Sequence, residues 1–462
     1  MIHCIPLTLI VACRLLLSSL CHASSEEEEG TLILSQLLWR HGDRSPTTLF
    51  PTYPGPVDAI WPMGLGALTP RGMEQHLLLG RELRKKFKGF INKTYHSSEI
   101  RVTSTDFDRT LMSAQMNMAG LYGQLTVREI RDVNETFSQP VPVHADFSGI
   151  LSPGAECPAF AREKAMVEKR SSDARRNREE NGTLVDSIKF QSGNVSLKIL
   201  NIADAVYCSD QHGVELPTWI ANNQTIKNYL DFYYSELGPR LFMGSDKLAR
   251  LGGGPLLSAL VAKMKEKIAG NLTQKVLAYS AHDVTIMALL GALRVFDNKQ
   301  PTYASLISVD LFRSPSSGPD EGSGTSADPY FVVVKYLRGV MRPDIGKAKI
   351  LVIPGCAKHC PLTKFVRSLA ENIAEGSADK CGRSGTESGA DALARDSVIL
   401  SLSMVIALLV ATLFFSCVFF LVRQRRMRNL LPMARFSLID DEASVPLTSH
   451  DDEGETYGFT LR

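Results

Sequence analysis

Apolar and polar positions divide the chain into short apolar runs, and three of these runs end abruptly in charged residues. They are LILSQLL before WRHGDRSP, IRVT before STDFDR, and KVLAY before SAHD. Short apolar runs bounded by polar clusters are typical of strands that are buried on both faces. The pattern predicts strands at about 32–39, 100–103 and 276–279. Each has charged residues just past its carboxyl end.

Helical spacing of apolar residues separates and follows these predicted strands. It occurs at 111–121 and at 286–293, and again in LTPRGMEQHLLLGRELRKKF, residues 68–87. In the last segment Thr69 is placed as the N-cap, and Pro70 lies in the first turn. Strands that alternate with helices predict an α/β fold with a largely parallel sheet flanked by helices.

The two ends of the chain carry apolar runs of a different kind. Residues 1–23 are interpreted as a secretory signal peptide that ends in Cys-His-Ala before an acidic run. Residues 397–422 form a run of 26 residues without a charged side chain. This exceeds the roughly 20 residues that a transmembrane helix needs. The arginine-rich RQRRMR that follows marks the cytoplasmic side, so residues 24–396 are expected in a lumen or outside the cell, and 423–462 as a cytoplasmic tail.

Glycosylation sequons and cysteines fit this topology. The N-x-[ST] sequons are at Asn92, Asn134, Asn181, Asn194, Asn223 and Asn271. The expected luminal part contains five cysteines: Cys157, Cys208, Cys356, Cys360 and Cys381. An oxidising compartment favours disulfides, and an odd number leaves one thiol unpaired. No second ligand cluster with zinc-like spacing lies near CAKHC, which favours a short-loop disulfide there over a metal site.

Composition excludes some partners and directs attention to a local site. The chain has 462 residues, 44% of them hydrophobic, which is enough for a large core. Its 51 basic and 49 acidic residues nearly balance, so nothing in the charge points to nucleic acid. Function is therefore expected from the charged clusters at the strand ends.

Those clusters predict a phosphate-binding site. Ligands of open α/β sheets bind outside the carboxyl ends of the strands, so the three clusters should meet in one crevice. Arg40, Arg44 and Arg109 would repel one another there unless an anion lies between them. Planar guanidinium groups suit phosphate oxygens, which makes phosphate the expected anion.

The histidines and the aspartate beside these arginines suggest a reaction. Nearby positive charge disfavours the imidazolium form, so His41 is expected to be a neutral nucleophile that attacks phosphorus. Asp283, which follows His282, is the candidate acid that protonates the leaving oxygen. A carboxyl group donates a proton only in its acid form, which predicts best activity at acid pH. This chemistry needs no metal and no other cofactor.

At this point the motifs resemble a known family. R-H-G-D-R-S-P at 40–46, S-T-D-x-D-R-T at 104–110 and S-A-H-D at 280–283 resemble the histidine acid phosphatases of the histidine phosphatase superfamily. The resemblance covers about residues 31–380, and the membrane-anchored lysosomal, testicular and prostatic members are the most similar. It implies a phosphoglycerate-mutase-like fold, in which a sheet and flanking helices form three layers. It also implies a smaller, mostly helical cap at about 135–260 and frequent homodimerisation.

The resemblance further implies a role for each site residue. His41 would be the phosphorylated nucleophile and Asp283 the proton donor. The residues implied as phosphate ligands are Arg40, Arg44, Arg109 and His282. Three other acidic residues near the motifs, Asp43, Asp106 and Asp108, are expected to orient the arginines or to cap helices.

The chain departs from the family pattern at two positions. Thr103 stands where relatives often have arginine, and Leu306 stands where they typically have cysteine. The second departure removes the partner that the family would give Cys208. The resemblance then implies disulfides Cys157–Cys381 and Cys356–Cys360, with Cys208 free. The segment Ser314–Pro329, rich in serine and glycine, is interpreted as a loop or insertion between strands.

Substrate and location remain open at this stage. The leading hypothesis is a single-pass type I membrane enzyme that hydrolyses phosphate monoesters in the lysosomal or the plasma membrane. Its substrates would be small phosphate esters or phosphorylated lipids or proteins. A narrower version limits them to lysophospholipids or inositol polyphosphates. The alternative from another class is a catalytically weak cell-surface binding or signalling protein that keeps the fold.

Overall fold

The computed structural model describes residues 30–126, 136–315, 328–339, 343–373, 381 and 389–429. The predicted signal peptide, the sequon at Asn134 and the tail beyond residue 429 lie outside these residues. The chain divides into two units, residues 1–385 and 386–462, and each is described by itself.

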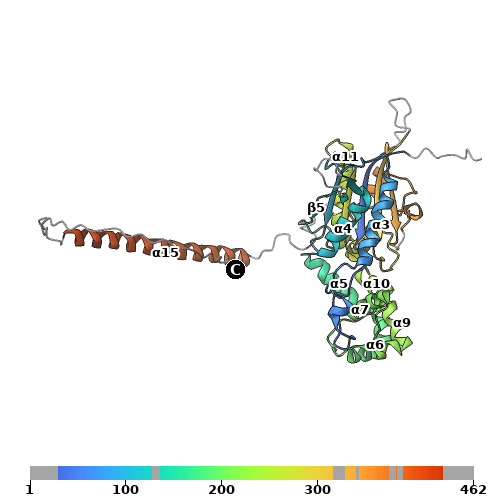
Figure 1. The fold of residues 1–462 in the computed structure, drawn as a ribbon, viewed down its shortest axis with the longest axis horizontal. Helices are drawn as coiled ribbons and strands as arrows, with labels where there is room; N and C mark the ends of the chain where they lie inside the picture. The colour runs from blue at the N-terminus through green and yellow to red at the C-terminus, as the bar shows by residue number, and fades with distance from the viewer. Residues whose placement is uncertain are drawn as a thin grey trace, which may run out of the picture. The chain divides into compact units, whose positions relative to one another are not determined.

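A mixed sheet lies at the centre of the first unit (Figure 1). Its strands run in the order β10-β8-β7-β1-β6-β2-β5, and β9 pairs with β8. The bounds are β1 (Thr31–Arg40), β2 (Ile100–Ser104), β5 (Val143–Ala145), β6 (Val276–Ala281), β7 (Leu306–Arg313), β8 (Tyr330–Leu337), β9 (Lys349–Leu351) and β10 (Cys360–Pro361). Strands β3 (Gln124–Thr126) and β4 (Thr136–Ser138) form a separate pair. The predicted strands at 32–39, 100–103 and 276–279 correspond to β1, β2 and β6.

The sheet is parallel in only half of its width, which corrects the expectation of a largely parallel sheet. Strands β1, β6, β2 and β5 are parallel to one another, whereas β7 to β10 pair antiparallel. An apolar run does not reveal strand direction, but the connection does. Antiparallel neighbours can be joined by a loop, whereas parallel ones need a crossover. The segment Ser314–Pro329 joins β7 to β8, and its residues 316–327 lie outside the described part.

Helices cover both faces of the sheet and complete three layers. Helices α3 (Pro70–Lys86) and α4 (Asp108–Tyr122) share one apolar cluster with Leu37 and Trp39 of β1. Helices α11 (Asp246–Ile268) and α12 (Asp283–Ala292) share the other with Leu34 and Leu38. Neighbouring residues of β1 thus point to opposite faces, as strand geometry requires. Thr69 caps α3 by accepting the Gly72 N–H, as predicted.

The segment between β5 and α11 begins with a loop at 146–157 and is mostly helical after it. Its helices gather at one end of the first unit, away from the middle of the sheet (Figure 1). The helices pack around two apolar clusters, one shared with Phe50 and the other with residues of α11 and α12. They are α5 (Pro158–Arg170), α6 (Ser172–Gln191), α7 (Ile199–His212), α8 (Thr218–Ala221), α9 (Gln224–Phe232), a π-helical turn (Tyr233–Leu237) and α10 (Gly238–Phe242). Shorter helices elsewhere are α2 (Val57–Ile60), a 3-10 turn (Ile345–Lys347) and α13 (Leu362–Ser368).

Two disulfides join parts of the first unit. They are Cys157–Cys381 and Cys356–Cys360, and Cys208 is buried and free, in agreement with the pairing that the resemblance implied. Because Cys356 and Cys360 are bonded to each other, neither offers a thiolate to a metal ion.

The second unit contains one long helix, α15 (Gly389–Asn429). Its segment Leu408–Arg426 is long and apolar enough to cross a membrane, and it overlaps the predicted span 397–422. The orientation of the span in a membrane remains a prediction.

Candidate active site

The register of the sheet brings the three charged clusters together. Arg40 at the end of β1 aligns with Ala281 of β6. One residue earlier, Ser280 of β6 aligns with Trp39 of β1 and with Ser104 of β2. All three strands therefore end at the same edge, as predicted. A pocket of about 520 Å³ opens there, and we call it the catalytic pocket; among its lining residues are His41, Arg44, Arg109, His282 and Asp283.

His41 lines this pocket in a defined tautomer. Its side chain is almost fully buried, with 2% exposed. Nδ1 lies 2.8 Å from the carbonyl oxygen of Gly42 and donates its hydrogen to it. The lone pair is therefore on Nε2. Burial first and then the charge of Arg40 hold the pKa of His41 well below its ordinary value, which favours the neutral ring.

His282 packs beside His41 with its hydrogen bonds fixed. The two ring centroids are 5.6 Å apart, edge to face. Nε2 of His282 donates to the hydroxyl of Thr105 over 3.0 Å, and Nδ1 accepts from Arg109 at 3.4 Å. Burial first and then Arg109 lower the pKa of His282 to about 4. In this state the ring has no spare N–H, so the expected role as a phosphate ligand requires a second proton on Nδ1.

Arg40 and Asp283 form an ion pair beneath the pocket. Arg40 is fully buried and donates to the Pro301 carbonyl at 2.5 Å, to the Tyr234 hydroxyl at 3.3 Å and to Asp283 at 2.8 Å. Burial raises the pKa of Asp283, but the charges of Arg40, Arg44 and His282 together outweigh it, and the pKa lies below its usual value. Gln300 donates to the same carboxylate over 2.7 Å. Asp283 is therefore a carboxylate in this structure.

Arg44 is held by a residue of α7. Both of its terminal nitrogens donate to the Asp204 carboxylate, at 2.8 and 3.1 Å, and both side chains are 8% exposed. Cys208, one helical turn further along α7, places its sulfur 3.6 Å from Arg44. Burial raises the pKa of this thiol to about 12, so it is uncharged.

A third residue on the same face of α7 contacts the motif that contains His41. His212 donates from Nε2 to the carboxylate of Asp43 at 2.5 Å, and the hydroxyl of Thr69 donates to the same oxygen. Asp43 thus joins the start of α3 to the end of α7 and does not orient an arginine directly. Residues 204, 208 and 212 recur at intervals of four, so they lie on one face of α7, and this face contacts the motif.

Each of the three arginines has a buried N–H group without a hydrogen-bond acceptor. In each of Arg40, Arg44 and Arg109 the Nε–H is buried and has no hydrogen-bond acceptor among the described residues. An unpaired buried donor costs about 1–3 kcal/mol. Three such donors beside a neutral imidazole form a site that an oxyanion would complete.

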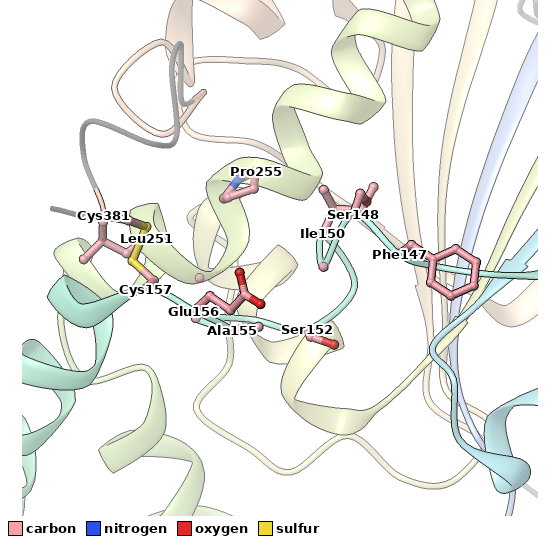
Figure 2. A pocket seen from close by; sticks show the side chains of 13 residues that line it. Phe147, Ser148, Ile150, Ser152, Ala155, Glu156, Cys157, Leu251, Pro255 and Cys381 are labelled. Carbon is pink, nitrogen blue, oxygen red and sulfur yellow. A yellow bond between two sulfur atoms is a disulfide. The ribbon is translucent and has the colours of Figure 1, made fainter. Parts of the chain in front are cut away.

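One wall of the catalytic pocket is the loop that precedes α5, whose Ser152, Gly154 and Ala155 line it. The same three residues also line a second pocket of about 230 Å³, bounded by Phe147, Leu251 and the Cys157–Cys381 disulfide (Figure 2). The disulfide therefore anchors the carboxyl end of the loop that forms this wall.

Comparison with known proteins identifies the family. Residues 31–331 match the sequence profile of the histidine phosphatase superfamily, branch 2. The chain belongs to this superfamily. This histidine phosphatase is 33% identical over 393 residues to the lysosomal acid phosphatase of Rattus norvegicus, a match that covers 82% of this chain and 87% of that one. It is 32% identical over 388 residues to the prostatic acid phosphatase of Mus musculus, covering 81% and 95%.

Solved structures show the same fold at lower identity. The phytase of Klebsiella sp. ASR1 matches with a TM-score of 0.55 and 17% identity, covering 77% of this chain and 98% of that one. The Hafnia alvei phytase matches with a TM-score of 0.54 and 16% identity, covering 77% and 99%. Likeness at this level concerns the fold alone.

Of the six site residues expected from the sequence, five line the catalytic pocket of this histidine phosphatase. The sixth, Arg40, lies buried against Asp283. The sequence analysis did not identify the residues that form hydrogen bonds to the motifs: Asp204, His212, Thr105 and Gln300. Thr105 lies inside the quoted motif STDFDR and could have been considered. The others carry no local signal, because each meets its partner only in the folded chain.

Proposed function

We propose that this histidine phosphatase hydrolyses phosphate monoesters in acid through a phosphohistidine on His41. The observation that carries the proposal is the set of three unpaired Nε–H donors around a neutral imidazole. The tautomer of His41 supports it, because its Nε2 lone pair is available to a phosphorus atom in the pocket. The names of the acid phosphatases that it resembles agree with this chemistry.

In the first step Nε2 of His41 attacks phosphorus, a bond from nitrogen to phosphorus forms, and the bond from phosphorus to the ester oxygen breaks. Positive charge of Arg44 and Arg109 stabilises the charge on the other phosphate oxygens in the transition state. The leaving oxygen takes a proton from Asp283, which avoids release of an alkoxide.

Asp283 is a carboxylate in this structure, so it must take up a proton when the substrate binds before it can act as an acid. A phosphate ester brings negative charge next to the Asp283 carboxylate and competes for its Arg40 partner. Both effects favour the neutral acid and raise the pKa. The same negative charge, together with movement of Arg109 toward phosphate, favours a second proton on His282. The site therefore takes up protons when it binds phosphate, and acid pH supports its activity.

In the second step water attacks the phosphohistidine. The Asp283 carboxylate accepts a proton from this water, the bond from nitrogen to phosphorus breaks, and His41 returns to its starting tautomer. When phosphate leaves, Asp283 and His41 carry the same protons as they did before the first step. No metal ion takes part in either step.

We place the catalytic unit on the luminal or extracellular side of a lysosomal or plasma membrane. The lysosomal acid phosphatase relatives and the apolar segment Leu408–Arg426 support this placement. Homodimerisation and the choice among small, lipid and protein substrates remain predictions from the resemblance.

The test is hydrolysis of an aryl phosphate by the full chain in detergent, across acid and neutral pH. The expected result is turnover in acid that His41→Ala removes. Folding of the variant is checked by its thermal transition. Equal activity in the two proteins would refute the mechanism and favour the binding-protein alternative.

A further inference from the structure

One face of helix α5 lines the catalytic pocket, and the helix continues beyond this pocket. Phe160, Ala161 and Lys164 line this pocket and recur at helical spacing on one face of α5. Lys164 and Glu168, one turn apart, line another pocket of about 380 Å³ among the helices between β5 and α11, which we call the cap pocket. Lys164 thus lies at the junction of the two pockets.

The charge of Lys164 is only weakly compensated. Its nearest carboxylate is Glu168 at 3.9 Å, and these two side chains are 39% and 53% exposed. Its ammonium group also lies 5.3 Å from the centre of the Phe242 ring. Exposed ion pairs at such a separation contribute little, so the ammonium group can exchange Glu168 for another anion.

The surroundings favour an anion over a cation at this junction. Among the described residues that line the catalytic pocket, Asp283 is the only carboxylate, and Arg40 neutralises it. The lining of the cap pocket holds one acidic residue, Glu168, and four basic ones: Lys164, Arg178, Lys189 and Lys198. A substrate that enters along α5 therefore meets positive charge beyond the phosphate site.

We propose that Lys164 binds a second anionic group of the substrate, so that the preferred substrates are phosphate monoesters whose leaving group ends in an acidic group. This inference rests on the proposed function, which places the ester phosphate beside His41. The rise of a helix is about 1.5 Å per residue, so Lys164 lies about 5 Å along α5 from Ala161 and Glu168 about 10 Å from it. The arm between the two anions should be flexible and of this order of length. Phe107, half exposed, and Phe160 offer apolar contacts to such an arm.

Two probes that differ only in the terminal group test this. They are hexyl phosphate and 6-(phosphonooxy)hexane-1-sulfonate, whose sulfonate stays ionised in acid. We expect the sulfonate ester to have a kcat/KM about fivefold higher, through a lower KM at similar kcat, because one exposed ion pair supplies no more than this. The preference should decline toward one at high salt.

Variants on α5 assign the preference to one side chain. Lys164→Met should reduce the ratio of the two kcat/KM values to about one, and Lys164→Arg should preserve it. Lys169→Met is the matched control, because Lys169 is exposed on the same helix and lines neither pocket. It should leave the ratio unchanged. Using the ratio removes any general effect of a substitution on folding or on turnover.

The outcomes separate this inference from the proposed function. If the enzyme does not hydrolyse hexyl phosphate in acid, the proposed function fails. If it hydrolyses both esters equally well, or keeps its preference in Lys164→Met, the proposed function stands and the second-anion site is refuted.

Discussion

Replacement of Asp283 by asparagine separates proton donation from phosphate binding. Asparagine keeps the shape and one acceptor oxygen, which can replace the Oδ2 that bonds to Arg40 at 2.8 Å. Its amide nitrogen then replaces the Oδ1 that accepts the Val284 N–H at 2.7 Å, and the amide cannot donate a proton as an acid. General acid catalysis contributes typically about 10²–10⁴-fold. We expect Asp283→Asn to lower kcat/KM by about 10³-fold for an alkyl phosphate, whose leaving group needs the proton. For nitrophenyl phosphate the loss should be about tenfold, because nitrophenolate leaves without one.

The substitution also has a cost in stability that must be measured separately. Arg40 is fully buried, and removing the charge of its partner leaves it with the Pro301 carbonyl and the Tyr234 hydroxyl. Loss of one member of a buried ion pair costs about 3–5 kcal/mol, and the acceptor retained by asparagine favours the lower end. Denaturant unfolding gives this value, and steady-state kinetics below the unfolding range gives the two rate losses. Equal losses on the alkyl and the nitrophenyl ester would refute the assignment of Asp283 as the acid.

Three further predictions concern the charges around the phosphate. Binding of sulfate, which does not titrate in this range, should take up a proton at His282 between its pKa of about 4 and its ordinary 6.5, and protonation of Asp283 adds to this uptake. Calorimetry in two buffers with different ionisation enthalpies measures the uptake, and heats that do not depend on the buffer would contradict it. Arg109→Lys should lower kcat/KM by roughly 10–150-fold, because a lysine loses the fork geometry and a charged hydrogen bond contributes about 1.5–3 kcal/mol; a loss below threefold would show that Arg109 does not bind the transferred group. Asp204→Asn should lower the free energy of unfolding by about 3 kcal/mol, because both members of its pair with Arg44 are only 8% exposed. Sulfate should raise the thermal transition of this variant by more than that of the wild type. An equal rise in the two proteins would count against Arg44 as an anion ligand.

Local sequence signals sufficed for the strands that carry the motifs and for most of the site. An apolar run followed by RHGDRSP or SAHD contains both the strand and the charged residues at its end. The rule that ligands lie at carboxyl ends of parallel strands then placed these residues together, and the register of β1, β6 and β2 agrees. The antiparallel half of the sheet was not foreseen, because strand direction depends on connections that apolar runs do not encode.

Residues that support the site from a distance could not be predicted in this way. Asp204 pairs with Arg44 across 160 positions and His212 with Asp43 across 169. A lone acidic residue or histidine in a helix is most often an ordinary surface residue, and only the packing of α7 against the motif gives these two a role. The state of Asp283 was likewise hidden, because its pKa depends on the position of Arg40 in the folded protein.

The most direct test of the mechanism is to locate the covalent phosphate. The full chain is mixed with an ester labelled in its phosphate, and the reaction is stopped within one turnover. Alkali is used to stop it because phosphohistidine is labile to acid. The protein is then digested for mass spectrometry. The account predicts label on Nε2 of His41, none on His282, and none in His41→Ala. Label on His282, or full turnover with no label on either histidine, would contradict it.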